Sequence, residues 1–257
     1  TATCPSYYTS SLLFYHLFEK GAYTVETFDM KSIDNRSIKF TVYSNETMSR
    51  YTELAKSVFN ELERDYGPWL HDQMIIYGTG GMFGGGMEYA GATLTSIRAL
   101  GHEMHHSYFA RAMSPAGGNA GWIDEALASW RDNKYPRGGG LSRTRMGGRS
   151  QYRRDTDRAA YSKGMNFIAH LDKKFADKEG MLPFLKEFGQ NYKFKTFTTP
   201  FFQEKLEEYF NEDLSGLFDG YIYGKSGFKK DRRGGRLSIE ENPYHPTLTK
   251  AQLRALL

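Results

Sequence analysis

Two histidines and a glutamate near the middle of the chain have the types and the spacing needed for chemistry at a metal ion. His102 and His106 fit the pattern H-E-x-x-H, with Glu103 directly after the first histidine. On a helix, residues four positions apart lie on one face, so the two imidazoles can point at a single ion. Glu103 then lies where its carboxylate can reach a water molecule at that ion. The spacing predicts a helix suited to metal-assisted hydrolysis.

A catalytic zinc site needs a third protein ligand, because zinc in such sites takes three protein groups and leaves the fourth position to water. The segment 121–128 has the pattern of a helix start, and Glu125 within it can supply that ligand. We therefore expect one Zn²⁺ per chain, bound by His102, His106 and Glu125. The alternative is an amphipathic helix whose histidines only satisfy buried partners. His105 lies on another face and is expected to be structural or at the surface.

The composition of this 257-residue chain permits one large domain, or one domain with a small appendage. Hydrophobic residues make up 39% of the chain and aromatic residues 15%, which is enough for a packed core. The net charge of +4 indicates no particular class of partner, and nothing in the sequence supports nucleic-acid binding. No apolar run is long enough to span a membrane. The single cysteine, Cys4, excludes an intrachain disulfide and a cysteine-based zinc site.

The hydrophobic pattern predicts strands in the first third of the chain and helices in the rest, which favours an α+β domain. Strands are expected over 38–43, 74–77 and 87–95. Helices are expected from Ser44 or Asn45 to Tyr66, over 96–113, around Glu125, from Asp155 or Thr156 onward, over 181–192, over 200–210 with Thr199 as the cap, and over 214–223. The glycine-rich segment 78–86 lacks the ending of a phosphate-binding loop, so we expect it to border a cleft.

These motifs resemble those of the gluzincin metallopeptidases, in particular the aminopeptidase N family. Glu125 follows H-E-x-x-H at that family's own gap, and the residues around it are similar as well. Gly85 to Tyr89 resembles the Gly-x-Met-Glu-Asn strand that borders the family's substrate cleft, with Tyr89 in place of the Asn. Tyr161-Ser-Lys-Gly resembles the element that carries the family's catalytic tyrosine. There is also some likeness to the glycyl aminopeptidase family.

The resemblance implies a thermolysin-like zincin catalytic domain, with a small mixed sheet and an active-site helix followed by a helical lobe. It also implies roles for individual residues. Glu103 would be the general base, Tyr161 would share the developing oxyanion with zinc, and Glu88 would bind a substrate's free α-amino group. The backbone around Gly86 and Met87 would bind the substrate as an added strand.

The sequence therefore predicts a zinc-dependent peptidase for peptide or protein substrates, and an aminopeptidase in preference to an endopeptidase. An endopeptidase with the same site stays an alternative, because Tyr89 replaces the family's Asn and the domains that wall off the cleft are absent. A non-catalytic zinc-containing binding module has less support, since ligands, base and tyrosine are all present. The arginine-rich loop 137–158 is expected near the cleft, where it would favour acidic substrates.

Residues 1–37 are expected to form an N-terminal segment left from a preceding domain, 38–224 the gluzincin catalytic domain, and 225–257 a basic C-terminal tail. Since the resemblance covers only the middle range, we expect the chain to be part of a larger multidomain protein. The chain begins at Thr1 without a Met. Together with the aromatic-rich composition, this favours export over a cytoplasmic location, and the compartment is left open.

Overall fold

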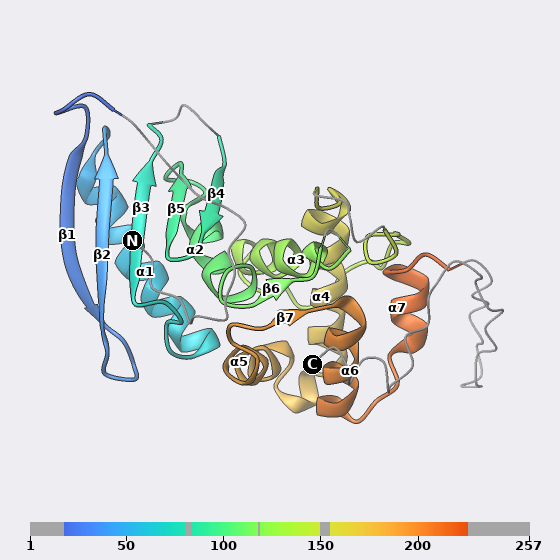
Figure 1. Cartoon of the computed structure of the whole chain (residues 1–257). Helices are drawn as coiled ribbons and strands as arrows, with labels where there is room; N and C mark the ends of the chain where they lie inside the picture. The colour runs from blue at the N-terminus through green and yellow to red at the C-terminus, as the bar shows by residue number, and fades with distance from the viewer. Residues whose placement is uncertain (1–17, 81–83, 118, 150–154, 226–257) are drawn as a thin grey trace.

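A computed structural model describes residues 18–80, 84–117, 119–149 and 155–225 of the chain (Figure 1). The strands are β1 (Thr24–Lys31), β2 (Ser37–Ser44), β3 (Gln73–Gly78), β4 (Gly86–Tyr89), β5 (Ala92–Thr95), β6 (Ser114–Pro115) and β7 (Thr196–Phe197). The helices are α1 (Met48–Tyr66), α2 (Leu100–Phe109), α3 (Gly121–Asp132), α4 (Met165–Lys174), α5 (Met181–Asn191), α6 (Thr199–Phe210) and α7 (Ser215–Tyr221), with a π-helical turn η1 (Ala160–Gly164) and a 3-10 turn η2 (Ala176–Lys178).

The five-stranded sheet is mixed, in the order β1-β2-β3-β5-β4. Strands β2, β3 and β5 run parallel, while β1 and β4 pair antiparallel with their neighbours. In Figure 1 the sheet lies at one end of the molecule, and α3 lies between it and the helices α4, α6 and α7. The α+β class, with a small mixed sheet, a central helix pair and a following helical lobe, is confirmed. Strand β4 is the edge nearest α2.

Strand β1 was not predicted, and its residues lie in the range 1–37 that the sequence sets apart as an N-terminal segment. It pairs with β2 from Thr24 opposite Ser44 to Lys31 opposite Ser37. The buried carboxylate of Glu63 on α1 fixes the turn after β1, because it accepts hydrogen bonds from Ser32 Oγ, the Ile33 amide and the Trp69 amide. Residues 24–31 are therefore attached to the sheet. The outer boundaries of the domain stay a prediction.

The single strand predicted over 87–95 is wrong, because the chain turns back in the middle of it. Strands β4 and β5 form an antiparallel hairpin in which Glu88 faces Thr93. Gly91 has a φ of +66°, in the left-handed region that favours glycine, and this allows the tight turn. The other two predicted strands are confirmed as β2 and β3, with Ile38, Phe40 and Val42 alternately buried along β2.

Helix α1 buries a stripe of residues at helical spacing against the sheet, as predicted. It begins later than expected, with Thr47 as its N-cap in place of Ser44 or Asn45. Ser44 Oγ instead accepts a hydrogen bond from the Glu46 amide, which keeps the chain in a turn before the helix. Gly67 ends α1 at a φ of +91° while its amide still bonds the Glu63 carbonyl.

Helix α2 is shorter than the predicted range 96–113. Before it, the Ser96 amide bonds the Gly85 carbonyl, which holds the entry to the helix against β4. After it, the amides of Arg111, Ala112 and Met113 each bond the carbonyl five residues earlier, so the chain widens into a π-type turn. The H-E-x-x-H residues themselves lie within the regular α-helical part.

The helical lobe has an aromatic core, in which Phe175 and Phe210 stack with ring centroids 3.8 Å apart. Helices α5, α6 and α7 lie at the predicted places. The cap of α6 is Thr198, whose hydroxyl accepts from the Phe201 amide. The predicted cap, Thr199, instead accepts a hydrogen bond from Trp122 Nε1 and donates to the Asn119 carbonyl, which joins α6 to α3.

The helix predicted from Asp155 or Thr156 begins later, at Ala160, and its first turn is the π-helical η1. Regular α-helix starts at Met165 with α4. None of the helices in the described part of the chain is long and apolar enough to cross a membrane. The predicted basic tail, apart from Lys225, lies outside the described residues.

Candidate metal centre and active site

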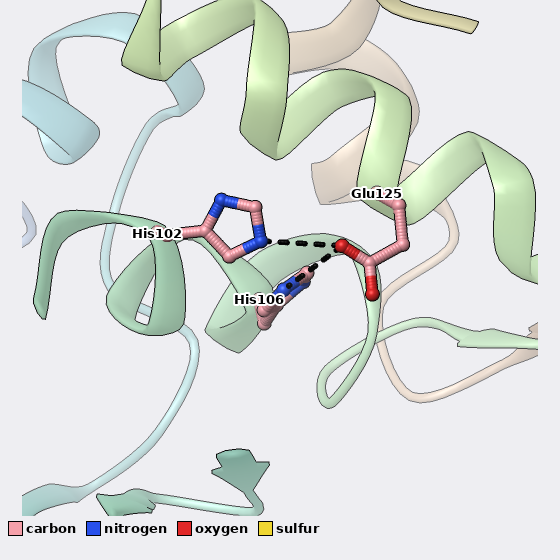
Figure 2. A group of neighbouring side chains, drawn as sticks. All are labelled: His102, His106 and Glu125. Atoms are coloured by element: carbon pink, nitrogen blue, oxygen red, sulfur yellow. Dashed lines mark hydrogen bonds and ion pairs between the residues drawn. The ribbon is translucent and has the colours of Figure 1, made fainter. Parts of the chain in front are cut away.

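Three predicted ligands from two neighbouring helices point at one another (Figure 2). His102 and His106 lie one turn apart on α2, and Glu125 lies on the first half of α3. Glu125 Oε2 lies 3.2 Å from His102 Nε2 and 3.7 Å from His106 Nε2. One atom from each of the three residues falls within a 4.8 Å cluster. Two imidazole nitrogens and one carboxylate oxygen at this spacing can surround a single divalent cation.

Both imidazoles are oriented by carboxylates on α3 that the sequence analysis did not single out. Asp132 Oδ2 lies 2.6 Å from His102 Nδ1, and Asp124 Oδ1 lies 2.5 Å from His106 Nδ1. These hydrogen bonds place the proton on each Nδ1, which leaves each Nε2 as the ligand atom. The donor set of two Nε2 atoms and one carboxylate, with each imidazole oriented by a second hydrogen bond, fits zinc.

The sequence holds a usable signal for one of these two aspartates. Asp124 directly precedes Glu125, and Asp132 follows Glu125 after two helical turns, so it returns to the same face of α3. A search of that face for second carboxylates would have found Asp132. Nothing in the sequence shows that Asp124, which points along the adjacent face, reaches His106.

Asp132 is itself held by a guanidinium that reaches across from α3 to α1. Arg131 binds Glu61 on α1 through two hydrogen bonds of 2.8 and 2.7 Å, and its Nη1 lies 3.2 Å from Asp132 Oδ1. The guanidinium passes so close to Gly101 that a Cβ there would lie 3.0 Å from Arg131 Cζ and closer still to Nη1. A chain of charged groups therefore runs from α1 to His102.

The charges of the cluster favour an ionised Glu125 carboxylate and protonated imidazoles. Burial lowers the pKa of His102, but its hydrogen bonds with Asp132 and Glu125 outweigh burial and hold the pKa at about 9. Burial raises the pKa of Glu125, but the hydrogen bond with His102 and the charge of His106 bring it below its usual value. A cation binding here would displace protons from the histidines.

Glu103 lies beside this cluster and is 5% exposed. Burial raises the pKa of its carboxyl to about 7, and its Oε2 has no hydrogen-bond partner among the described residues. The side chain lies against the backbone of Gly86 on β4, where an added Cβ would lie 2.6 Å from Glu103 Cδ and 2.7 Å from Oε1. Gly86 is therefore the residue that makes room for Glu103.

Tyr161 lies on the π-helical turn η1, next to His102 and Glu125. Its ring stacks on the His102 ring with centroids 6.2 Å apart, and its hydroxyl lies near the Glu125 carboxylate. Burial, followed by the charge of Glu125, raises the pKa of this phenol. The ring is 45% exposed, so it is not a core aromatic residue. Gly164, in the same turn, lets η1 approach α3, since a Cβ there would lie 2.9 Å from the Ala126 Cβ.

Glu88 and Met87 lie on the edge strand β4. Oxygens of Glu88 and Glu103 and a nitrogen of His106 fall within 4.8 Å of one another, so Glu88 borders the metal cluster. Glu88 is already paired: its Oε1 accepts a hydrogen bond of 2.7 Å from Arg111 Nη2. The sequence analysis did not single out Arg111. Met87 is 44% exposed on the same edge.

Two further predictions can be placed in the structure. His105 is structural, since it is fully buried between the rings of Tyr66 and Phe109. In the arginine-rich loop, Arg137 pairs with Asp172 and Arg149 with Asp157, so these two guanidinium groups serve the fold. Residues 150–154 of the loop lie outside the described residues, and the preference for acidic substrates stays a prediction.

Solved structures with a similar fold include two peptidases and a hydrolase. Aminopeptidase A from Legionella pneumophila, crystallised with aspartic acid, matches with a TM-score of 0.62 and 14% identity over 79% of this chain. An M1 zinc metallopeptidase from Deinococcus radiodurans matches with a TM-score of 0.54 and 15% identity over 73%. Leukotriene A4 hydrolase from Saccharomyces cerevisiae matches with a TM-score of 0.55 and 16% identity over 75%. The chain has the fold of the M1 zinc metallopeptidases.

The likeness to the M1 fold is structural. No known family model matches the sequence, and no curated protein sequence matches it. The chain spans 28% of the Legionella enzyme, 49% of the Deinococcus enzyme and 38% of the yeast enzyme. The resemblance to zinc aminopeptidases that the motifs indicated is therefore confirmed at the level of fold, for a segment shorter than those enzymes.

Proposed function

We propose that this chain is a zinc-dependent peptidase, with one zinc bound by His102, His106 and Glu125. The observation that carries the proposal is the convergence of these ligand atoms within 4.8 Å, each imidazole oriented by its own carboxylate. Zinc bound there would supply Lewis acidity, which lowers the pKa of water and polarises a peptide carbonyl. The M1 fold of the chain supports the same cofactor.

The chain's own residues supply the proton transfers. Glu103 accepts the proton of the attacking water on its carboxylate and returns it to the nitrogen of the leaving amine. A carboxyl whose pKa burial has raised to about 7 is well matched to both steps. Tyr161 donates its hydroxyl hydrogen bond to the oxyanion that develops on the carbonyl, and its exposure leaves the phenol open to a substrate.

The edge strand β4 supports binding of an extended peptide beside the metal cluster. Its outer edge pairs with no other strand in the described sheet, so a substrate can add to Gly86 and Met87 by backbone hydrogen bonds. Glu88, at the end of this strand, then lies where the substrate's α-amino group would bind. This arrangement favours an aminopeptidase.

An endopeptidase with the same site is the second candidate, and one observation favours it. The Glu88 carboxylate is already paired with Arg111, which reduces its attraction for a free amine. A non-catalytic zinc-containing module is the third reading. The placement of Glu103 and Tyr161 beside the ligand cluster speaks against that reading, because a scaffold needs neither group there.

The test is to incubate the zinc-loaded full chain with a mixed peptide library, with and without a chelator, and to read the cut positions by mass spectrometry. We expect chelator-sensitive removal of N-terminal residues, and internal cuts would identify an endopeptidase. Glu103→Gln should keep stoichiometric zinc and lose activity about 10²- to 10⁴-fold. Glu53→Gln, an exposed carboxylate on α1, is the matched control. Equal hydrolysis by wild type and Glu103→Gln would remove Glu103 from the mechanism.

A further inference from the structure

The carboxylate of Glu88 lies between the guanidinium of Arg111 and the side chains of Glu103 and His106 at the candidate metal site. On one side its Oε1 binds Arg111 Nη2 at 2.7 Å. On the other side its oxygens lie within the 4.8 Å cluster that includes Glu103 and His106. The side chains of Arg111 and Glu88 are only 15% and 19% exposed, so solvent screens the pair weakly. The position that would bind a substrate amine therefore already holds a positive charge.

Arg111 is held in place by the helix that carries the histidines. It follows α2 directly, and its amide bonds the His106 carbonyl at 2.9 Å through the π-type turn. Its backbone is thereby fixed relative to the metal-ligand residues, and the hydrogen bond with Glu88 holds the guanidinium. Met87 and Glu88 are fixed from the other side, since β4 pairs with β5 along its length. The contact joins two well-anchored elements.

The hydrogen bond from Arg111 changes which substrate groups the Glu88 carboxylate attracts. A free carboxylate attracts a substrate ammonium group strongly, because the hydrogen bond is charge-assisted. When one carboxylate oxygen is bound to Arg111, the remaining oxygen carries less negative charge, and the guanidinium repels a second cation nearby. A neutral acetylated N-terminus or an internal peptide unit suffers no such repulsion.

We propose that Arg111 is a specificity-determining residue that weakens the site's selection for a free α-amino group. This inference rests on the proposed peptidase function. In the wild-type chain Arg111 shares Glu88 with the substrate, so a peptide with a free N-terminus is preferred only weakly over one with a blocked N-terminus. When the guanidinium is removed, both carboxylate oxygens of Glu88 can bind the substrate amine. The site then selects strictly for a free N-terminus, as an aminopeptidase does.

The experiment compares the peptide Ala-Ala-Ala-Ala with its N-acetylated form, using the zinc-loaded full chain. The measured quantity is the ratio of kcat/KM for the free peptide to that for the acetylated one. Arg111→Gln should raise this ratio at least about tenfold, the lower end of the contribution of a charge-assisted hydrogen bond. Arg98→Gln removes an exposed guanidinium before α2 and should leave the ratio unchanged. Arg111→Lys keeps the charge and should stay near the wild-type ratio, which separates charge from packing.

The dependence on Glu88 provides the decisive control. In a Glu88→Gln background, adding Arg111→Gln should raise the ratio by less than it does in the wild-type background, because the shared carboxylate is gone and only the loss of direct repulsion remains. An unchanged ratio in the Arg111→Gln single variant would overturn the proposal, as would an equal rise in the Glu88→Gln background. Slower cleavage of both peptides by the same factor would also overturn it, since that outcome assigns Arg111 to folding or to general activity.

A binding measurement distinguishes failure of this inference from failure of the proposed function. In the Glu103→Gln background, calorimetry gives the Kd of each peptide without hydrolysis. If the wild-type chain cleaves neither peptide, the peptidase proposal fails, and the Kd ratio still decides the role of Arg111. We expect Arg111→Gln to raise the preference for the free peptide in this background at least about tenfold as well. An unchanged Kd ratio would refute the role.

Discussion

Replacing Gly86 by alanine should move the catalytic base without touching a metal ligand. An added Cβ would lie 2.6 Å from Glu103 Cδ and closer still to Cγ, whereas ordinary contacts begin at 3.4 Å. The difference at Cδ, 3.4 minus 2.6, requires a displacement of at least about 0.8 Å. Neither partner can yield freely, because Glu103 is buried and β4 is paired with β5. A misplacement of about 1 Å in a catalytic group costs about 100-fold in rate, so kcat/KM should fall by about that factor.

The neighbouring Gly85 provides the control for this change. A Cβ at Gly85 meets nothing within 4 Å, so Gly85→Ala should stay within about twofold of wild type. The assay is kcat/KM on a free tetrapeptide, with zinc content and melting temperature measured on the same preparations. Gly86→Ala should keep the zinc and remain folded at the assay temperature, with a melting temperature lowered by about 2 to 12 °C because of the added crowding. Retention of activity within a few-fold, or an equal loss in Gly85→Ala, would refute the view that Gly86 makes room for Glu103.

Two other variants test separate parts of the molecule. Tyr161→Phe removes the hydroxyl from an exposed ring, so kcat should fall about 10²- to 10³-fold with zinc content unchanged, and an unaltered kcat would exclude Tyr161 as the oxyanion donor. His71 is buried with its Nε2 on the Ser107 carbonyl, and burial lowers its pKa to about 4 from 6.5, so protonation opposes folding. The free energy of unfolding should therefore fall as the pH drops below about 6.5, by about 2 kcal/mol from this group between pH 7 and 5. Denaturant titrations at both pH values should show a smaller drop for His71→Gln, and an identical drop would contradict the assignment.

The parts of the site that could be predicted from the sequence are those set by local periodicity. His102 and His106 lie on one helical face because they are four residues apart, and that spacing needs no tertiary information. The helix around Glu125 was likewise predictable from its own pattern. The structure then supplied what sequence spacing cannot, namely that α2 and α3 bring the Glu125 oxygen to within 3.2 Å of an imidazole.

The parts that sequence reasoning missed depend on contacts between distant residues or on hydrogen-bond patterns that leave no mark in composition. Arg111 and Glu88 are residue types that usually lie at the surface, and only the packing of β4 on α2 brings these two together. The π-helical turn that presents Tyr161 uses the same residue types as an α-helix. The hairpin turn at Gly91 was hidden inside an apolar run, since a glycine in such a run is also compatible with a continuous strand.

Arg131 links helix α1, which carries none of the candidate catalytic residues, to the tautomer of His102. Glu61 fixes the guanidinium, the guanidinium fixes Asp132, and Asp132 fixes the imidazole. The proposed metal affinity therefore depends in part on a helix that an engineer would treat as inert scaffold. Transplanting only α2 and α3 into another protein would carry over every candidate metal-ligand atom. It would still lose the support that Glu61 gives, through Arg131 and Asp132, to the orientation of the His102 imidazole.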